Sequence, residues 1–267
     1  PVRALFDLHV NLLAGPTGTI AVGVLGLLLL LASATGVVVW WPRAGRWLEA
    51  VAVRLSGSTR RVNYDLHRSG GFWTLLYLAV LALTGSGLVF YGATGDLLNR
   101  ATGSSSPPPP PSSAEPPEGA GGGTGPGAIS PALVDDAWRS ALRRAPEADV
   151  TFISLPSGPR DPLSVRFRLP PEIHPVGRSF AYADRWSGEL LRVDRQPQMD
   201  TGPKLLHALY PIHIGDFRLG PIPPAVVRAI WALLGLAPAG LLVTGTLVWW
   251  WRGGNGEPNR VAPEVEG

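Results

Sequence analysis

The histidines are the residues of this chain best suited to chemistry, because an imidazole nitrogen can bind a metal and can exchange a proton near neutral pH. The chain has five histidines and no cysteine, so disulfides, thiolate metal sites and iron–sulfur clusters are excluded. Four of the five lie beside long apolar segments: His9, His67, His207 and His213. Histidine near membrane depth is costly and indicates function by default. His174 stands between prolines, and we interpret it as an ordinary loop residue.

Two of the apolar segments end in one repeated pattern of residues: Thr35-Gly36 with Trp40-Trp41, and Thr244-Gly245 with Trp249-Trp250-Trp251. Histidine precedes both copies, His9 the first and His207 and His213 the second. Imidazole is the usual axial ligand of haem iron, and helix bundles commonly bind cofactors between facing helices. Hydrogen bonding at an interface explains any single histidine, but it does not explain the equivalent places of His9 and His213. The repeat therefore predicts paired haem ligands across a bundle.

Glycines recur at the levels of these histidines. Residues 67 and 85 are roughly 27 Å apart along a helix, so Gly85 should lie beside His9 and His213. By the same argument Gly36 and Gly245 should lie beside His67. Small residues also let membrane helices pack closely without a cofactor, but that alternative leaves their match to the histidine levels unexplained. The predicted cofactor-binding set is His9, His213, His67, His207, Gly85, Gly36 and Gly245, with His9, His213 and His67 as ligands of haem iron.

Three segments are long enough to position these residues inside a membrane: Ile20 to Trp41, Phe72 to Tyr91 and Ala229 to Trp251. None contains a charged residue, and roughly 20 apolar residues cross a ~30 Å hydrocarbon core as a helix. Only 16% of the chain is charged, against about 25% in soluble proteins. The sequence predicts an integral membrane protein, an all-α helical bundle with three transmembrane helices and a small α+β domain outside the membrane.

Arginine sets the predicted orientation. The connection between the first two spans is rich in it: Arg43, Arg46, Arg54, Arg60, Arg61 and Arg68, against Glu49 and Asp65. The positive-inside rule places this connection in the cytoplasm, and Arg252 and Arg260 place the C-terminus there too. His9, His207 and His213 then lie at the outer face and His67 at the inner face. We interpret the tryptophans as an aromatic belt in preference to an electron relay.

The second and third spans are joined by a long outer connection. It opens with Pro107 to Pro111 and Gly121 to Gly123, a composition that buries no core and indicates a spacer. A helix capped by Ser130, strands near residues 150–155 and 163–169, and a hairpin over 179–194 then predict a compact α+β unit.

The chain therefore divides into nine predicted segments. These are the outer segment and start of the first helix at 1–19, the spans at 20–42, 71–92 and 228–252, the cytoplasmic loop at 43–70, the linker at 93–128, the α+β domain at 129–198, the histidine-bearing outer segment at 199–227 and the cytoplasmic tail at 253–267.

The membrane segments carry four distinctive motifs: Asp7-Leu8-His9 with Trp40-Trp41-Pro42-Arg43; Asp65-Leu66-His67-Arg68 with Leu83-Thr84-Gly85; Tyr210-Pro211-Ile212-His213-Ile214-Gly215 with Leu234-Gly235-Leu236-Ala237-Pro238; and Thr244-Gly245 with Trp249-Trp250-Trp251-Arg252. Together these motifs resemble the PepSY-associated transmembrane family. The unit that ends at residues 182–189 resembles a PepSY domain more weakly.

The resemblance implies a multi-pass protein of the bacterial inner membrane. The better-understood members are ferric-siderophore reductases, with haem b in a bundle of four principal helices. The family's first helix, with its own histidine near the cytoplasmic face, and an earlier periplasmic segment would precede residue 1. One or two haems are expected. The outer haem would keep His9 with His213 or His207, and we choose His213, leaving His207 to bind a propionate or a substrate. The inner haem would have His67, and its second ligand would come from the preceding part, from another chain, or not at all.

Two functions of different classes follow. The first is transmembrane electron transfer to an acceptor such as a periplasmic ferric chelate, an oxidoreductase activity of the ferric-chelate reductase type. No dinucleotide-binding fingerprint occurs, so the donor would be separate, on the cytoplasmic side or a quinone or flavin. The alternative is a non-catalytic accessory subunit that docks other membrane subunits through the PepSY-like domain. A regulator of periplasmic peptidases is a third reading that rests on the small domain alone. The lipid bilayer is an expected partner, and the net charge of +3 gives no reason to expect nucleic acid.

Overall fold

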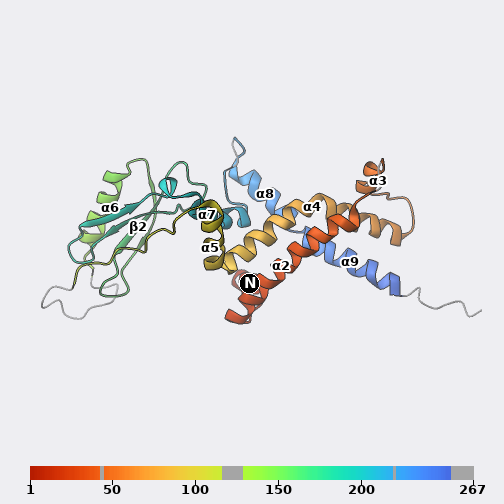
Figure 1. The fold of residues 1–267 in the computed structure, drawn as a ribbon, viewed down its shortest axis with the longest axis horizontal. Coiled ribbons are helices and arrows are strands. Elements are labelled where there is room, and N and C mark those ends of the chain that lie inside the picture. The colour runs from red at the N-terminus through yellow and green to blue at the C-terminus, as the bar shows by residue number, and fades with distance from the viewer. Residues whose placement is uncertain (43–44, 116–128, 219–220, 254–267) are drawn as a thin grey trace, which may run out of the picture. The chain divides into compact units, whose positions relative to one another are not determined.

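The computed structural model describes residues 1–42, 45–115, 129–218 and 221–253. Its contacts divide the chain into two compact units, one formed by Pro1–Leu83 with Ala229–Gly267 and one by Thr84–Arg228. Arg43, the glycines Gly121 to Gly123, and the tail with Arg260 lie outside the described residues. Figure 1 shows the two kinds of architecture, long helices and a helix-covered sheet.

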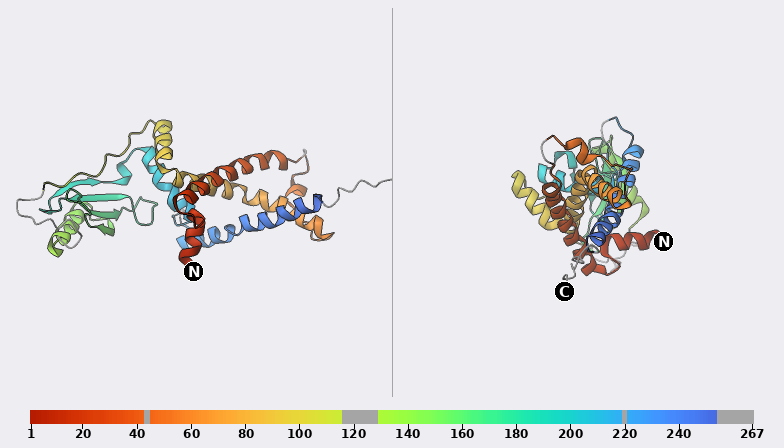
Figure 2. Two further views of the ribbon diagram at one scale, coloured as in Figure 1. Left: turned by 90° about the horizontal axis from the view of Figure 1, so that it is seen from below. Right: turned by 90° about the vertical axis from the view of Figure 1, so that its right-hand side faces the viewer.

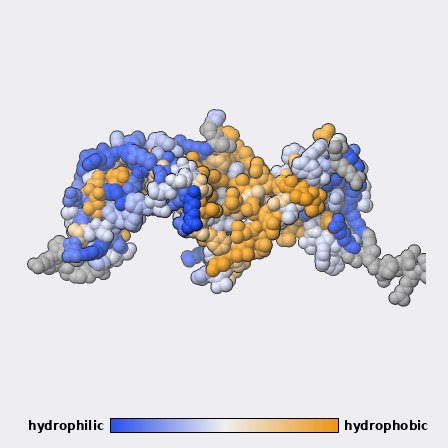
Figure 3. Space-filling view, viewed as in Figure 1, coloured by the Kyte–Doolittle hydropathy of each residue, from blue (hydrophilic) through white to orange (hydrophobic). Residues whose placement is uncertain are grey.

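Three helical segments of the described chain are long and apolar enough to cross a membrane: α2 (Gly15–Trp40), α4 (Thr59–Val89) and the run Pro224–Arg252. Their leucines are largely exposed, among them Leu25, Leu28 and Leu31. Apolar surface covers these helices in Figure 3. Such a broad apolar surface indicates contact with lipid, and the three predicted membrane helices are confirmed.

The bounds of the spans differ from the predicted ones where polar residues continue a helix. Helix α4 begins at Thr59, inside the predicted loop 43–70, because its first turns pack polar side chains against that loop. The third span is two helices, α8 (Pro224–Leu234) and α9 (Ala237–Gly253). Gly235 and Pro238 explain the break, since glycine weakens a helix and proline lacks an amide hydrogen but suits a first turn.

A short helix precedes the first span and meets its start at a steep angle (Figure 2). Helix α1 (Val2–Asn11) ends at Leu12 and Leu13, which both have positive φ, and α2 then begins at Gly15. A Cβ on Gly18 would overlap the carbonyl oxygen of Asn11, so only glycine permits this approach. The turn between α1 and α2 thus depends on one glycine of α2.

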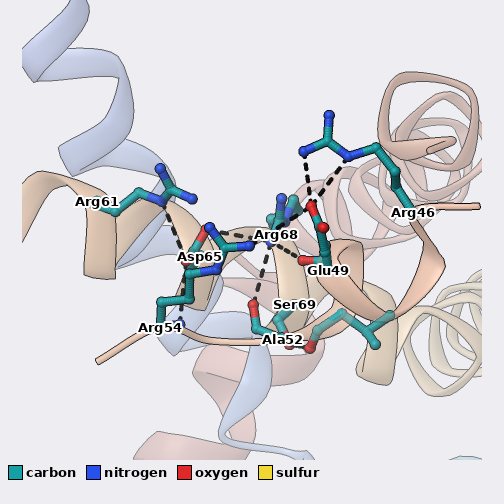
Figure 4. A network of polar contacts seen from close by, with 9 residues as sticks. Arg46, Glu49, Ala52, Arg54, Arg61, Asp65, Arg68 and Ser69 are labelled. Atoms are coloured by element: carbon teal, nitrogen blue, oxygen red, sulfur yellow. Dashed lines mark hydrogen bonds and ion pairs between the residues drawn. The ribbon is translucent and has the colours of Figure 1, made fainter. Parts of the chain in front are cut away.

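The arginine-rich loop is anchored on the start of α4 (Figure 4). Asp65 of α4 is 1% exposed, and its carboxylate lies 3.4 Å from Arg68 Nη2 and 3.5 Å from Arg61 Nε. The Arg68 guanidinium also donates to the carbonyl oxygen of Glu49 in α3 (Trp47–Val51), at 2.7 Å. The Arg54 amide of the loop donates to the Asp65 carboxylate at 3.3 Å, so Asp65 and Arg68 together hold the loop on α4.

The other unit contains a four-stranded antiparallel sheet with order β1-β2-β3-β4. The strands are β1 (Asp149–Ser154), β2 (Leu163–Arg168), β3 (Ser179–Ala183) and β4 (Leu190–Asp194). Alternate residues of β2, Leu163, Val165 and Phe167, are fully buried against Ala137 and Ala141 of α6 (Pro131–Arg144). Ser130 caps α6 by accepting from the Leu133 amide. The small α+β domain predicted after residue 129 is confirmed as a helix-covered sheet.

Two further helices of this unit pack on each other, α5 (Tyr91–Thr102) and α7 (Thr201–Ile214). A short 3-10 helix, Gln196–Gln198, precedes α7. A Cβ on Gly95 of α5 would lie 3.1 Å from Leu206 of α7, so the two helices meet closely. Residues 93–102 were expected to belong to the linker and are helical instead.

The proline-rich segment after α5 was expected to be a free spacer, and its described part is not. Ser105 donates to Asp200 at 2.8 Å, and the Arg192 guanidinium donates to the Pro109 carbonyl oxygen at 2.9 Å. The Ala114 amide donates to Asp184 at 2.6 Å. Proline leaves carbonyl oxygens without local partners, and the α+β domain supplies donors to them.

Candidate functional site

His67 lies on α4 against the middle of α9. Its Nδ1 is 3.0 Å from the hydroxyl oxygen of Thr244, and the Asn63 side chain, one turn earlier on α4, donates to the Thr244 carbonyl oxygen at 2.9 Å. Asn63 is 7% exposed. One threonine of α9 is therefore held by two polar side chains of α4.

The hydrogen bonds of Thr244 determine where the His67 proton resides. The Thr244 hydroxyl donates its single proton to the Gly240 carbonyl oxygen at 2.8 Å. Its oxygen can then only accept from His67, so the imidazole proton is on Nδ1. The lone pair is left on Nε2, which is the nitrogen that a metal-binding histidine of this kind uses.

Glycine gives the His67 ring its space. A Cβ built on Gly245 would lie 2.9 Å from Cε1 of His67 and 3.4 Å from Nδ1. These separations are too short for a side chain, so the ring packs directly on the backbone of α9. The sequence prediction that Gly245 lies beside His67 is correct.

The same arrangement occurs a second time, in the other unit. His213 Nδ1 is 3.0 Å from the hydroxyl oxygen of Thr84, and a Cβ on Gly85 would lie 2.9 Å from Cε1 of His213. Thr84 is 4% exposed. We call each such unit, Thr84-Gly85 with His213 and Thr244-Gly245 with His67, a Thr–Gly cradle. Gly85 beside His213 was also predicted.

The two halves of the second cradle lie on helix ends. His213 is in the last turn of α7, which Gly215 closes with φ +68°. His9 has the corresponding place in α1, in its last turn before a left-handed residue. His9 and His213 thus repeat one local structure, a short helix that ends in histidine and leads into a membrane helix.

One predicted glycine, Gly36, is not brought into these cradles. A Cβ on Gly36 would meet no described atom within 4 Å, so Gly36 is exposed and does not pack on His67. The Thr35 hydroxyl donates to carbonyl oxygens of its own helix, Leu31 at 3.0 Å and Ala32 at 3.1 Å. The face of α2 that carries Thr35-Gly36 therefore differs from the cradles. No haem-ligand role is tested by these contacts, and those of His9, His67 and His213 stay predictions.

His207 lies on α7 about two turns before His213, in a cluster that the sequence did not reveal. His174, interpreted as an ordinary loop residue, is 4% exposed and stacks on Tyr210 of α7 with 5.5 Å between ring centroids. Burial and then the charge of Arg178 lower the pKa of His174 to about 3, and the same causes lower the pKa of His207 to about 4. Both histidines are neutral at physiological pH. Only a long-range contact links His174 to α7, so local sequence gave no signal for it.

In the described part of the chain, no three histidine, aspartate or glutamate side chains gather closely enough to hold a bare metal ion. The cradles instead present single imidazoles from separate helices. Such donors suit a ligand that brings its own equatorial nitrogens, as a haem does.

Comparison with known proteins gives a family. The model of the PepSY-associated TM region matches residues 1–252. An uncharacterized protein of Pseudomonas aeruginosa is 25% identical over 251 residues, which cover 92% of this chain. The chain spans 62% of the length of that relative.

Proposed function

Because the chain belongs to the PepSY-associated TM region family, we propose that it is a haem-b-binding protein of the bacterial inner membrane that passes electrons across the bilayer. The observation that carries the proposal is the repeated Thr–Gly cradle. Two histidines on separate helices are held through Nδ1, each against a glycine, with the same separations. Packing alone gives no reason for one geometry to occur twice around histidine.

The residues of the first cradle fit a haem ligand, with His67 as the residue that would hold the iron. Thr244 fixes the proton of His67 on Nδ1 and leaves the Nε2 lone pair for iron. Gly245 lets the imidazole sit against the helix backbone, which restricts its rotation. Bound haem would supply one-electron oxidation and reduction, and two imidazole ligands would leave no open iron position for other chemistry.

Helix α4 supports both sites. It contributes His67 to one cradle and Thr84-Gly85 to the other, and it is one continuous helix. Both candidate haem sites therefore draw residues from one helix.

The remaining ligands and partners belong to the same proposal. His9, in the place that repeats that of His213, would be the second ligand of the outer haem. The second ligand beside His67 would come from outside this chain's five histidines or be absent. The donor would be separate, and a periplasmic ferric chelate is the acceptor that the family resemblance favours. The arginine-rich loop would face the cytoplasm and the α+β domain the periplasm.

The test is the haem content of the purified protein, counted as pyridine haemochrome, in His67→Ala and His213→Ala. Each substitution should remove the haem of its own site and leave any other haem in place. Leu205→Ala, at an exposed position of α7, is the matched control and should retain the haem that His213→Ala loses. Unchanged haem content in both His67→Ala and His213→Ala would overturn the ligand assignment.

A further inference from the structure

A second polar cluster of the Thr84–Arg228 unit takes no part in the cradles. It brings together His174 and Arg178 of the loop between β2 and β3, Arg166 of β2, and His207 of α7, the helix that ends with His213. Both arginines are close enough to both histidines to lower their pKa values. The loop is held on α7 by the stacking of His174 on Tyr210.

The proton of His174 is on the ring nitrogen that points away from its own loop. The Val176 amide donates to His174 Nδ1 at 3.3 Å, so Nδ1 is an acceptor and the proton of the neutral ring is on Nε2. This Nε2–H is buried and has no partner among the described residues. A buried donor without an acceptor is costly, so this one indicates an acceptor that binds there.

Two more nitrogen atoms of the cluster are also buried without a hydrogen-bond partner among the described residues. Arg178 Nε and His207 Nδ1 are buried and lack a partner within the described ranges. The three atoms come from two separate elements, the loop and α7. His174 is buried, whereas Arg178 and His207 are only half-buried, so a ligand can reach the cluster from the surface.

The charge of the cluster is positive. Arg166 and Arg178 contribute two positive charges and Glu172 one negative charge, which leaves one positive charge, and the two histidines are neutral. The Glu172 carboxylate is already engaged in hydrogen bonds, because it accepts from Ser179 Oγ at 2.5 Å and from the amides of Leu169 and Arg178. Arg166 is fixed by two hydrogen bonds to the Gly177 carbonyl oxygen, the longer of 2.9 Å, and lies between the rings of Phe152 and Phe180.

We propose that His174 Nε2–H, Arg178 Nε–H and His207 form a binding site for a carboxylate on the outer helix α7. A monoanion neutralises the uncompensated charge, and two oxygen acceptors on one carbon can pair with donors that two neighbouring elements supply. The carboxylate has two sources, a propionate of a haem bound at His213 or a carboxylate of a free ligand outside the membrane. The propionate source rests on the proposed function, and the free source does not.

Binding of a free carboxylate is tested with citrate and the full chain in detergent, purified without haem. Citrate should raise the thermal unfolding temperature of the wild type, and its uncharged triethyl ester should not. The effect should vanish in Arg178→Gln and weaken at least about tenfold in apparent affinity in His174→Phe, which keeps a ring to stack on Tyr210. Arg139→Gln, at an exposed ion pair of α6, is the matched control and should respond as the wild type does.

The two sources are separated by loading the protein with haem b or with its dimethyl ester. If a propionate occupies the site, haem b abolishes the citrate response and binds about tenfold more tightly than the ester, a preference that Arg178→Gln removes. If the response to citrate survives haem loading, the carboxylate is a free one. A response to citrate in a protein that takes up no haem would contradict the proposed function and would still support this carboxylate site. Absence of any citrate response, together with equal affinity for haem and ester, overturns the site.

Discussion

At the scale of single residues, each cradle gives a histidine inside the membrane a hydrogen-bond partner. An imidazole has two nitrogens, and an unpaired one is costly where water is absent. Thr244 pairs with Nδ1 of His67 and Thr84 with Nδ1 of His213. A neighbouring glycine then lets the ring approach the helix closely enough for that hydrogen bond to form. The pairs Thr84-Gly85 and Thr244-Gly245 are thus explained by the histidines that they hold.

Gly245→Ala tests this account of the first cradle. Its new methyl group would lie 2.9 Å from His67 Cε1, so the ring or α9 must move. We expect a loss of about 1–3 kcal/mol in stability and a reduced content of the haem at His67. Gly240→Ala is the matched control on α9, because a Cβ there meets nothing within 4 Å among the described atoms. Equal thermal unfolding temperatures and equal haem contents for the two variants would contradict the cradle.

The neutral histidines of α7 and its loop predict a pH dependence. The pKa of His174 is lowered by burial, Arg178 and Arg166 from 6.5 to about 3. The unfolded chain therefore binds a proton that the folded chain does not between these values. Stability is complete above pH 6.5 and falls as the pH drops toward 3, by at most about 1.4 kcal/mol per pH unit for this group. Thermal unfolding from pH 7 to pH 4 should show a shallower slope in His174→Phe than in the wild type; equal slopes would refute the assignment.

At the scale of elements, the turn between α1 and α2 determines where His9 lies. The approach depends on Gly18, whose Cβ would overlap the Asn11 carbonyl oxygen. Leu12 and Leu13 hold left-handed conformations in the turn, which cost roughly 1–2 kcal/mol each and persist only if packing compensates for them.

Gly18→Ala should therefore displace α1, whereas Gly36→Ala on the same helix should not, since its Cβ meets no described atom within 4 Å. With His9 as a ligand of the outer haem, Gly18→Ala weakens binding of that haem and leaves the inner one unaffected. Haem titration of the two variants measures the difference. If the outer haem binds equally well in Gly18→Ala, His9 is not a ligand of that haem.

Several elements could be predicted from the sequence because one local signal determines each. Uncharged apolar runs gave the three spans, and alternation gave a strand over 163–169. The rise per residue of a helix was enough to predict that Gly85 lies beside His213 and Gly245 beside His67. His174 and the proline-rich segment could not be interpreted correctly, since their contacts with Tyr210 and Arg192 join distant parts of the chain.

At the scale of the whole molecule, the chain is a membrane protein with a folded domain on one of its connections. Its apolar spans expose leucine over their length, and its α+β domain has a core of its own around Phe167. The chain matches the family model over residues 1–252 and spans 62% of its relative in Pseudomonas aeruginosa. Electron transfer by the whole protein accordingly remains a proposal, and its central requirement is bound haem.

The most direct test is the dithionite-reduced minus oxidised absorption spectrum of the wild-type protein, purified from haem-replete cells, with a haemochrome count per chain. We predict a sharp b-type α-band and one or two haems per chain, the second only if His67 finds a partner ligand. A spectrum with no haem band would contradict the proposal. It would favour instead a non-catalytic accessory subunit whose α+β domain docks other proteins.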